Sequence, residues 1–258
     1  MYYLIGNVVI AIENLISLNR EWTKFLYDGI EQSNVCIWGL KAREIYLIEA
    51  YSLKKNVNNI FQYKDDIMLT DYQWKNIQFC GKISINSIDV FTNQIFYTHA
   101  VQRRMIQIHS SMIDYQGKGL LFLGPSGIGK TTMAELWNKY RNALIINGDM
   151  NFVQETEECF LGWGTPWHGS SPYCENANVP VCALIVLKQA QENSIRRLEG
   201  FEKVQLVSNN IIYPTWLENG MELCLETLDH LLSSLPVYEL SCRPDEDAVR
   251  LTEKTIFN

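Results

Sequence analysis

The sequence lacks a long apolar run, an excess of positive charge and paired cysteines, and each absence excludes a class of protein. No stretch reaches the roughly 18 to 20 uninterrupted apolar residues that a membrane-spanning helix needs. Lys and Arg number 22 against 29 Asp and Glu, and this net charge of -7 disfavours a nucleic-acid partner. The seven cysteines show no CxxC or Cys/His ligand spacing, so neither a disulfide framework nor a zinc site is expected.

Cysteines without a pairing pattern predict reduced thiols and therefore a cytoplasmic protein. The lack of a long apolar run predicts no membrane partner. The apolar N-terminus MYYLIGNVVIAIENL has no basic segment and is interrupted by Asn7 and Glu13. It therefore does not fit a signal peptide, and residues 2–11 predict a first strand instead. The 47% apolar content is enough to fill the core of one large domain or two small ones.

Residues 1–100 differ from residues 101–258 in their sequence pattern, and this difference predicts two structural parts of the chain. In the first part, short β-branched and aromatic runs predict strands, and a helix is expected at REWTKFLYDGI. The runs are NVCIWGL, EIYLIEAY, DIMLTDYQW, KISINSI and NQIFYTH. In the second part, GLLFLG, NALIING, VPVCALIVLKQ and LPVYELSC predict buried strands, and GKTTMAELWNKY, GMELCLETLDHLLSSL and EDAVRLTEKTIFN predict helices. The expected fold is α/β with a β-rich N-terminal part.

Residues 124–131, GPSGIGKT, fit the pattern G-x-x-x-x-G-K-[ST] between a predicted strand and a predicted helix. Glycines allow backbone N–H groups to turn toward phosphates, the lysine can bridge the β- and γ-phosphates, and the threonine hydroxyl can bind magnesium. The pattern predicts ATP and Mg²⁺ binding, against the alternative of a glycine-rich turn that binds nothing. The residues expected to hold the nucleotide are Gly124, Pro125, Ser126, Gly127, Ile128, Gly129, Lys130, Thr131 and Thr132.

An acidic residue is needed to complete the metal site, and Asp149 is the candidate. It ends the apolar run ALIINGD, nineteen residues after Lys130. With Thr131 it is expected to contact magnesium, and it also has the chemistry to orient an acceptor hydroxyl. The alternative is a solvated turn residue.

These motifs together resemble the C-terminal domain of HPr kinase/phosphorylase, a bacterial serine kinase family whose core is related to phosphoenolpyruvate carboxykinase. The resemblance covers residues 105–153 well and rests on Ile108-His109, Asp114, Gly117-Lys118-Gly119, the phosphate loop and NGD. It implies a P-loop nucleotide-binding catalytic domain over residues 101–258, a serine kinase activity, and oligomers. It also implies that His109, Lys130 and Asp149 act in catalysis, with His109 on a hairpin strand beside the phosphates. A half-buried strand histidine with a local hydrogen bond is the alternative for His109.

The sequence departs from this family where two adjacent aspartates are expected, because Gly148 precedes Asp149. One carboxylate is therefore missing, and the phosphorylase direction is in doubt. We expect forward kinase chemistry only, because positioning and charge neutralisation dominate phosphoryl transfer.

The segment GWGTPWHGSSPYCENANVP, residues 162–180, has the composition of an ordered loop and predicts a wall or lid over the site. His168, Ser170 and Ser171 are candidates for contacts to phosphate or acceptor; the alternative is a loop that only packs its tryptophans. In its general composition this segment resembles stand-alone HPr-kinase-like proteins of bacterial peptide-modification clusters, including those that act on lasso-peptide precursors. Arg196 is a candidate γ-phosphate contact, against the alternative of a solvated charge.

Three hypotheses follow for function. The first is a kinase that phosphorylates a Ser or Thr hydroxyl of a peptide or small protein, such as a ribosomally made peptide precursor, with residues 1–100 recognising the acceptor. The second is a kinase of a small molecule such as free serine. The third is a nucleotide-sensing module without catalysis, which the missing carboxylate supports.

Overall fold

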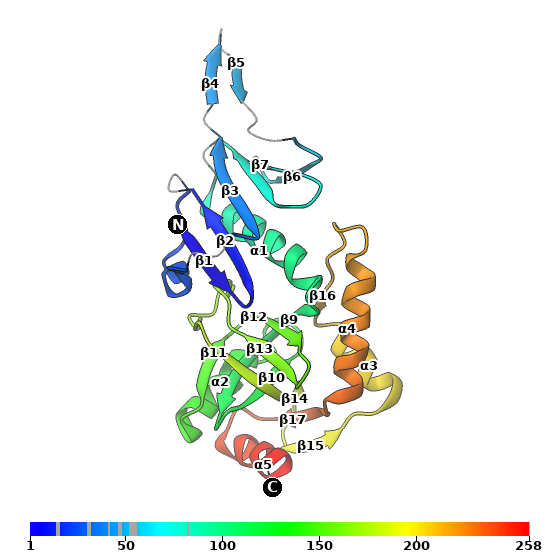
Figure 1. Ribbon diagram of the computed structural model, residues 1–258. Coiled ribbons are helices and arrows are strands. Elements are labelled where there is room, and N and C mark those ends of the chain that lie inside the picture. Colours follow the sequence, from blue (N-terminus) through cyan, green and yellow to red (C-terminus); the bar gives the residue numbers. More distant parts are fainter. Residues whose placement is uncertain are drawn as a thin grey trace. The chain divides into compact units, whose positions relative to one another are not determined.

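The computed structural model describes residues 1–13, 16–29, 32–40, 42–45, 48–51, 56–81 and 83–257. Contacts divide the chain into two compact units, Met1–Ala100 and Val101–Asn258. Both are drawn in Figure 1. The chain is mixed α/β and its N-terminal part is rich in strands, as the sequence predicted.

The first unit is built on a six-stranded sheet in the order β1-β2-β3-β8-β7-β6. Its strands are β1 (Tyr2–Ile5), β2 (Val8–Ile12), β3 (Val35–Leu40), β6 (Asn59–Tyr63), β7 (Asp66–Thr70) and β8 (Asn76–Cys80). The pairs β2–β3 and β3–β8 are parallel and the others are antiparallel. The helix expected from residue 20 is a short 3₁₀ helix, η1 (Arg20–Phe25), which buries Trp22 against Tyr3. The last residue of that predicted helix, residue 30, lies outside the described residues.

A separate hairpin occupies the segment EIYLIEAY, where one strand was expected. It consists of β4 (Ala42–Ile45) and β5 (Ile48–Tyr51), paired antiparallel. Residues 46 and 47, the middle of the predicted strand, lie outside the described residues.

Helix α1 (Ile85–Val101) shows that the strand predictions for KISINSI and NQIFYTH were wrong. Ile88, Phe91 and Ile95 are buried, and their spacing places them on one helical face. The Ser84 hydroxyl accepts the backbone N–H three residues further on at 3.3 Å, as at a helix N-terminus. Burial of this stripe outweighs the strand preference of the β-branched side chains. Lys82, at the start of KISINSI, is outside the described residues.

The second unit is a nine-stranded sheet in the order β10-β9-β12-β13-β14-β17-β15, with β11 and β16 also paired to β9. The strands are β9 (Met105–Tyr115), β10 (Lys118–Leu123), β11 (Leu144–Asn147), β12 (Met150–Glu155), β13 (Phe160–Trp163), β14 (Asn178–Gln189), β15 (Ser194–Arg197), β16 (Ile211–Ile212) and β17 (Val237–Cys242). Because β14 also pairs parallel to β10, the strands from β10 to β14 close into a ring.

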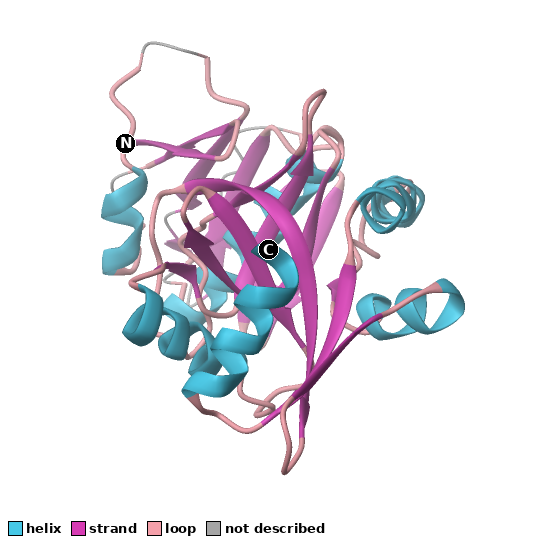
Figure 2. Ribbon diagram, turned by 90° about the horizontal axis from the view of Figure 1, so that it is seen from below, coloured by secondary structure: helices cyan, strands magenta, loops and turns pink. Residues whose placement is uncertain are grey.

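Four helices cover this sheet, and Figure 2 shows α3 and α4 across it from α2 and α5. They are α2 (Lys130–Arg141), α3 (Gly200–Ser208), α4 (Gly220–Ser234) and α5 (Glu246–Phe257). Trp137 of α2 and Val249 of α5 share one buried core with residues of β10 and β14. The predicted strand, loop, helix and strand therefore form at β10, α2 and β11. No helix in the described part of the chain combines the length and hydropathy of a membrane span.

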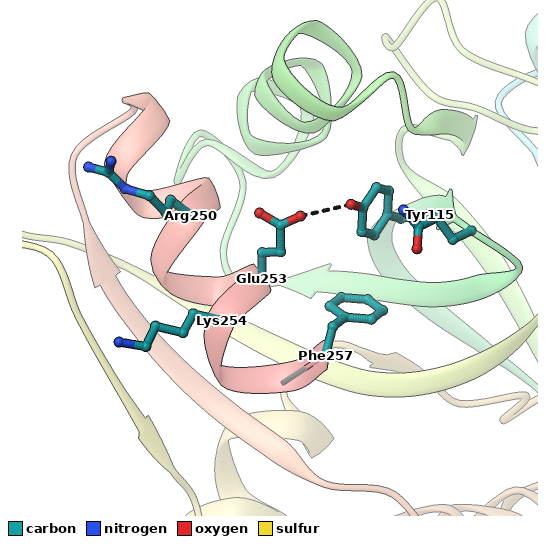
Figure 3. A pocket seen from close by; sticks show the side chains of 6 residues that line it. Tyr115, Arg250, Glu253, Lys254 and Phe257 are labelled. Carbon is teal, nitrogen blue, oxygen red and sulfur yellow. Dashed lines mark hydrogen bonds between the residues drawn. The ribbon is translucent and has the colours of Figure 1, made fainter.

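Helix α5 is fixed to the β9–β10 hairpin beside a pocket of about 500 Å³ (Figure 3). Tyr115 Oη donates to Glu253 Oε1 at 2.7 Å, and Arg141 Nε of α2 donates to Glu253 Oε2 at 2.7 Å. The bond to Glu253 raises the pKa of Tyr115. One carboxylate thus ties α5 to both α2 and β9.

Candidate functional site

The glycine-rich loop spans residues 124–129 and joins β10 to α2. Gly127 and Gly129 have φ values of 80° and 113°, a left-handed region that residues with a Cβ rarely adopt. Gly129 precedes the helix and supplies no side-chain cap, so the amides of the first turn lie uncapped at the positive end of the helix. Pro125 and Ser126 are exposed on the loop. A loop of this form is suited to hold an anion such as phosphate.

Lys130 begins α2, and only 6% of the residue is exposed. Its Nζ donates to the carbonyl oxygens of Gly124 at 3.0 Å and Pro125 at 3.3 Å. Burial lowers the pKa of Lys130, and the nearby carboxylate of Asp149 opposes this shift. The amine is therefore held within its own loop and within electrostatic range of Asp149.

Thr131 follows on α2 and contacts the segment that carries Asp149. Its Oγ1 donates to the carbonyl oxygen of Gly148 at 3.3 Å, and Ser111 Oγ of β9 donates to the same oxygen at 2.9 Å. Because Gly148 immediately precedes Asp149, the helix and the strand-end carboxylate are fixed side by side. Thr132, also expected at the nucleotide, is exposed on the next position of the helix.

His109 and Asp149 lie in direct polar contact, with Nε2 and Oδ1 3.0 Å apart. Their side chains are 31% and 26% exposed, so a ligand can reach both. His109 lies on β9, which forms a hairpin with β10 as predicted, and it pairs in register with Met150 of β12. The partner of His109 is therefore the predicted metal-binding carboxylate, and the residues His109, Lys130, Thr131 and Asp149 surround one site.

Asn147, which the sequence reasoning missed, orients Asp149. It is fully buried, and its Oδ1 accepts the backbone N–H groups of Asp149 at 2.9 Å and Met150 at 3.0 Å. Its Nδ2 donates to the carbonyl oxygens of Thr165 at 3.1 Å and Trp167 at 2.9 Å. One side chain thus joins the strand end to the loop that follows. The only signal in the sequence was an asparagine that ends an apolar run.

Asn210 is a second residue that the sequence reasoning missed. It lies between α3 and β16, and it is 6% exposed. Its Oδ1 accepts the N–H of Gly124 at 2.9 Å, and its backbone carbonyl accepts the N–H of His109 at 2.8 Å. Its Nδ2 donates to the carbonyl oxygen of Leu206 at 2.9 Å. This residue therefore supports both the glycine-rich loop and the strand of His109.

The tip loop, residues 168–171, lies directly against Gly148 and Asp149. A Cβ added to Gly148 would be 1.8 Å from Ser171 Oγ, so the serine fills the space of any side chain there. Gly169 has a φ of 58°, and a Cβ added to it would be 2.1 Å from Asp149 Oδ2. The space that a second carboxylate would need at position 148 is thus occupied.

Within this tip loop the three predicted contact residues differ in environment. Ser171 is buried, and its Oγ accepts the N–H of Tyr173 at 3.3 Å. His168 is half-buried with Nδ1 against the carbonyl oxygen of Ser171. Ser170 is exposed. Ser170 and His168 therefore remain accessible on the tip loop, whereas Ser171 packs against Gly148.

The tryptophans of the same segment pack onto the unit, as the alternative interpretation of the segment expected. Trp167 is 4% exposed and its ring centroid lies 6.3 Å from that of Phe152. Trp163 Nε1 donates to Gln154 Oε1 at 3.1 Å. The tryptophans anchor the loop, and only its tip lies at the site.

The structure does not bring Arg196 to the glycine-rich loop. It lies on β15, which β17 and β14 separate from β10 in the sheet. Its guanidinium donates to Glu202 at 2.6 and 2.8 Å and to Glu239 at 3.0 Å, and these bonds raise its pKa. Arg196 therefore belongs to a surface ion-pair network, because its donors are engaged by carboxylates.

The donor set near the loop fits magnesium better than a softer metal. Thr131 and Asp149 offer hydroxyl and carboxylate oxygens, which Mg²⁺ prefers. Among the described residues no group of three or more His, Cys, Asp or Glu side chains is placed to hold a metal ion. Mg²⁺ is commonly held by one or two protein oxygens together with substrate phosphates and water, and this arrangement matches that pattern.

The comparisons with known proteins place the chain in a family. It belongs to the family described as SynChlorMet cassette protein ScmC, whose model matches residues 81–241, more than half of the chain. No curated protein matches the sequence. Among solved structures, the Hpr(Ser) kinase/phosphatase from Coxiella burnetii shares 9% identity with a TM-score of 0.37, over 58% of this chain and 95% of that one.

Proposed function

We propose that the chain is an ATP- and magnesium-dependent kinase that transfers the γ-phosphoryl group to a Ser or Thr hydroxyl of a peptide or small protein. The observation that carries this proposal is the contact of Thr131 with Gly148, which sets the loop hydroxyl beside Asp149. Lys130 and His109 lie around the same carboxylate. The sequence resemblance of residues 105–153 to HPr kinase/phosphorylase supports phosphoryl transfer as the chemistry.

In this proposal the loop amides and Lys130 bind the β- and γ-phosphates of ATP. On binding, Lys130 exchanges its bonds to the carbonyls of Gly124 and Pro125 for phosphate oxygens, which satisfies a buried cation with a stronger partner. Thr131 and Asp149 would supply the protein oxygens for magnesium, and the bound ion would offset the charge of the phosphates.

Asp149 also serves the acceptor. Its Oδ1 is bonded to His109, whereas Oδ2 faces Gly169 of the tip loop. We propose that Oδ2, which His109 does not contact, receives the proton of an acceptor hydroxyl once the tip loop makes room for it, and that His109 fixes the orientation of the carboxylate. A single weak base suffices because the transition state of phosphoryl transfer is loose.

The environment of Gly148 supports transfer in the forward direction only. Ser171 fills the space that a second carboxylate would need. The same observation favours the second candidate function, a nucleotide-sensing module that does not catalyse transfer. A kinase of a small molecule such as free serine is distinguished from the first proposal by its acceptor alone.

Residues 1–100 are proposed to recognise the acceptor. Among the described strands of their sheet, β6 (Asn59–Tyr63) stands at the end and pairs with β7 alone. An edge of this kind offers backbone groups on which an extended peptide can add a strand.

The test is incubation of the purified chain with γ-labelled ATP, magnesium and a panel of serine-containing peptides, free serine and HPr, with label located by mass spectrometry. Label on a peptide or HPr supports the proposal. Label on free serine indicates a small-molecule kinase instead. ATP that binds without transfer favours the sensing module.

Two variants accompany the assay. Lys130→Ala should weaken ATP binding by about 10- to 100-fold, as expected for losing a charge-assisted hydrogen bond worth roughly 1.5–3 kcal/mol. Asp149→Asn should reduce transfer and the magnesium dependence of binding. Unchanged nucleotide affinity in Lys130→Ala would show that the loop is not the nucleotide site.

A further inference from the structure

A serine of the chain itself is next in sequence to the glycine that lies against Asp149 Oδ2, the oxygen proposed to accept the proton of the acceptor. Ser170 directly follows Gly169, which contacts Asp149 Oδ2. Consecutive Cα atoms are about 3.8 Å apart, so the Ser170 hydroxyl lies at most about 10 Å from that oxygen.

The other hydroxyl groups next to Asp149 are engaged or buried. Ser111 and Thr131 donate to a backbone carbonyl at 2.9 and 3.3 Å. Ser171 is buried and accepts a backbone N–H at 3.3 Å. Ser170 is exposed, and within the described residues its side chain makes no hydrogen bond. It is therefore the hydroxyl of the tip loop that is available for reaction.

The loop that carries Ser170 is anchored on both sides of its tip. Before the tip, the amide of Asn147 holds the carbonyls of Thr165 and Trp167. After the tip, the carbonyl of Tyr173 accepts the N–H of Gly148 at 3.3 Å. The tip is thus kept at the site at a high effective concentration, which an acceptor from solution has to match.

We propose that Ser170 is a phosphoacceptor for the kinase activity of its own chain, an inference that rests on the proposed function. The bond between the γ-phosphorus of ATP and its bridging oxygen breaks, and a bond from phosphorus to Ser170 Oγ forms. The hydroxyl proton passes to Asp149 Oδ2 and then to solvent, and ADP leaves. No further reactant is required.

Phosphorylation of Ser170 changes the charge of the site. A phosphoserine carries about -1.5 to -2 charges at neutral pH, next to the carboxylate of Asp149 and near the phosphates of any incoming ATP. Like charges this close weaken ATP binding, so the reaction limits itself to one phosphoryl group per chain and lowers transfer to other acceptors.

The experiment incubates the full chain with ATP and magnesium without any acceptor, and maps phosphate by tandem mass spectrometry. ATP binding is measured in parallel with a non-hydrolysable analogue. Phosphate is expected on Ser170 in the unmodified chain, at a rate per chain that does not depend on protein concentration.

The variants test the site of labelling. Ser170→Ala should lack the phosphate at position 170, Ser170→Thr should retain a phosphorylated hydroxyl there, and Lys130→Ala should lose most of the label. Ser194→Ala, at an exposed serine of β15, is the matched control and should be labelled normally.

The outcomes separate this inference from the function on which it rests. A chain that phosphorylates an added acceptor but never Ser170 overturns the inference and keeps the kinase. A chain that binds the analogue and consumes no ATP overturns both and leaves a sensing module. Labelling of Ser170 that rises with protein concentration overturns the intramolecular route.

Discussion

Asn210 Oδ1 accepts the backbone N–H of Gly124 at 2.9 Å, across 86 residues of sequence. The backbone carbonyl of the same Asn210 accepts the N–H of His109 at 2.8 Å. The first glycine of the loop and the strand that carries the His–Asp pair therefore share one support. A shift of Asn210 would displace both the glycine-rich loop and the strand that carries His109.

Replacing Asn210 should damage stability and nucleotide binding together. Asn210→Leu leaves the buried N–H of Gly124 without a partner, which should lower the free energy of unfolding by about 1–3 kcal/mol. Loosening of the loop should also weaken ATP binding about tenfold, because this corresponds to roughly 1.4 kcal/mol. Urea unfolding and titration with an ATP analogue measure the two effects.

The neighbour Asn209 supplies the control for this prediction. It is exposed at the end of α3, and Asn209→Ala should change stability by no more than about 0.5 kcal/mol. A folded Asn210→Leu variant with unchanged ATP affinity would remove Asn210 from the set of positioning residues.

Gly148 and Ser171 should show strong energetic coupling. Gly148→Ala places a methyl group 1.8 Å from Ser171 Oγ, and overpacking of this kind costs about 1–3 kcal/mol or more. In Gly148→Ala/Ser171→Gly both crowding atoms are gone, and the next neighbour, Tyr173 Cδ2, is at an ordinary 3.7 Å. A double-mutant cycle of unfolding free energies should therefore show rescue, and simple additivity would contradict the contact.

His109 should matter more for transfer than for ATP binding. Its ring contacts Asp149 Oδ1 and orients the carboxylate, so His109→Ala should lower the rate of phosphoryl transfer by about 10- to 100-fold, toward the lower range for acid–base groups. ATP affinity should change much less.

A second His–carboxylate pair on the same unit allows a control for His109. His230 Nδ1 lies 3.0 Å from Glu155 Oε1, away from the loop, and His230→Ala should affect neither quantity. Equal losses of binding and transfer in His109→Ala would indicate a structural role for the histidine.

Lys130 should give the unliganded chain a pH-dependent instability. Burial lowers the pKa of Lys130 below its ordinary 10.5, so the folded state disfavours the protonated amine that the unfolded chain retains. This cost is fully present below the lowered pKa and disappears as pH rises through it toward 10.5. Lys130→Met removes the cation, so its stability advantage over the unmodified chain should be largest at neutral pH and shrink in alkali. Urea unfolding over a pH series measures this, and a difference independent of pH would refute it.

The parts of the fold that sequence predicted correctly are those with local signals. The run GLLFLG, the loop glycines and the helix from Lys130 follow from apolar content and turn chemistry within about 20 residues. Helix α1 was missed because its Ile and Thr residues favour strands, and the spacing of Ile88, Phe91 and Ile95 was the signal that decided its structure.

The supports of the site could not be predicted because they depend on tertiary contacts. The contact of Asn210 with Gly124 depends on the pairing of β16 with β9, and no sequence pattern around Asn210 indicates it. Arg196 was misplaced for the same reason, since its partners Glu202 and Glu239 come from α3 and β17. By contrast, local sequence patterns indicated Lys130, Thr131 and Asp149 as site residues. Nothing local showed that Thr131 would contact Gly148.

The dual role of Asn147 limits how this protein can diversify. The same amide side chain holds the backbone of Asp149 and the carbonyls of Thr165 and Trp167. Replacing the whole segment between β13 and β14 with another sequence would therefore also displace the carboxylate of Asp149. Within the tip loop, Gly169 and Ser171 pack against Asp149 and Gly148, so variation that leaves the Asp149 carboxylate in place is confined to His168 and Ser170. A library randomised at these two positions tests whether the loop selects the proposed acceptor.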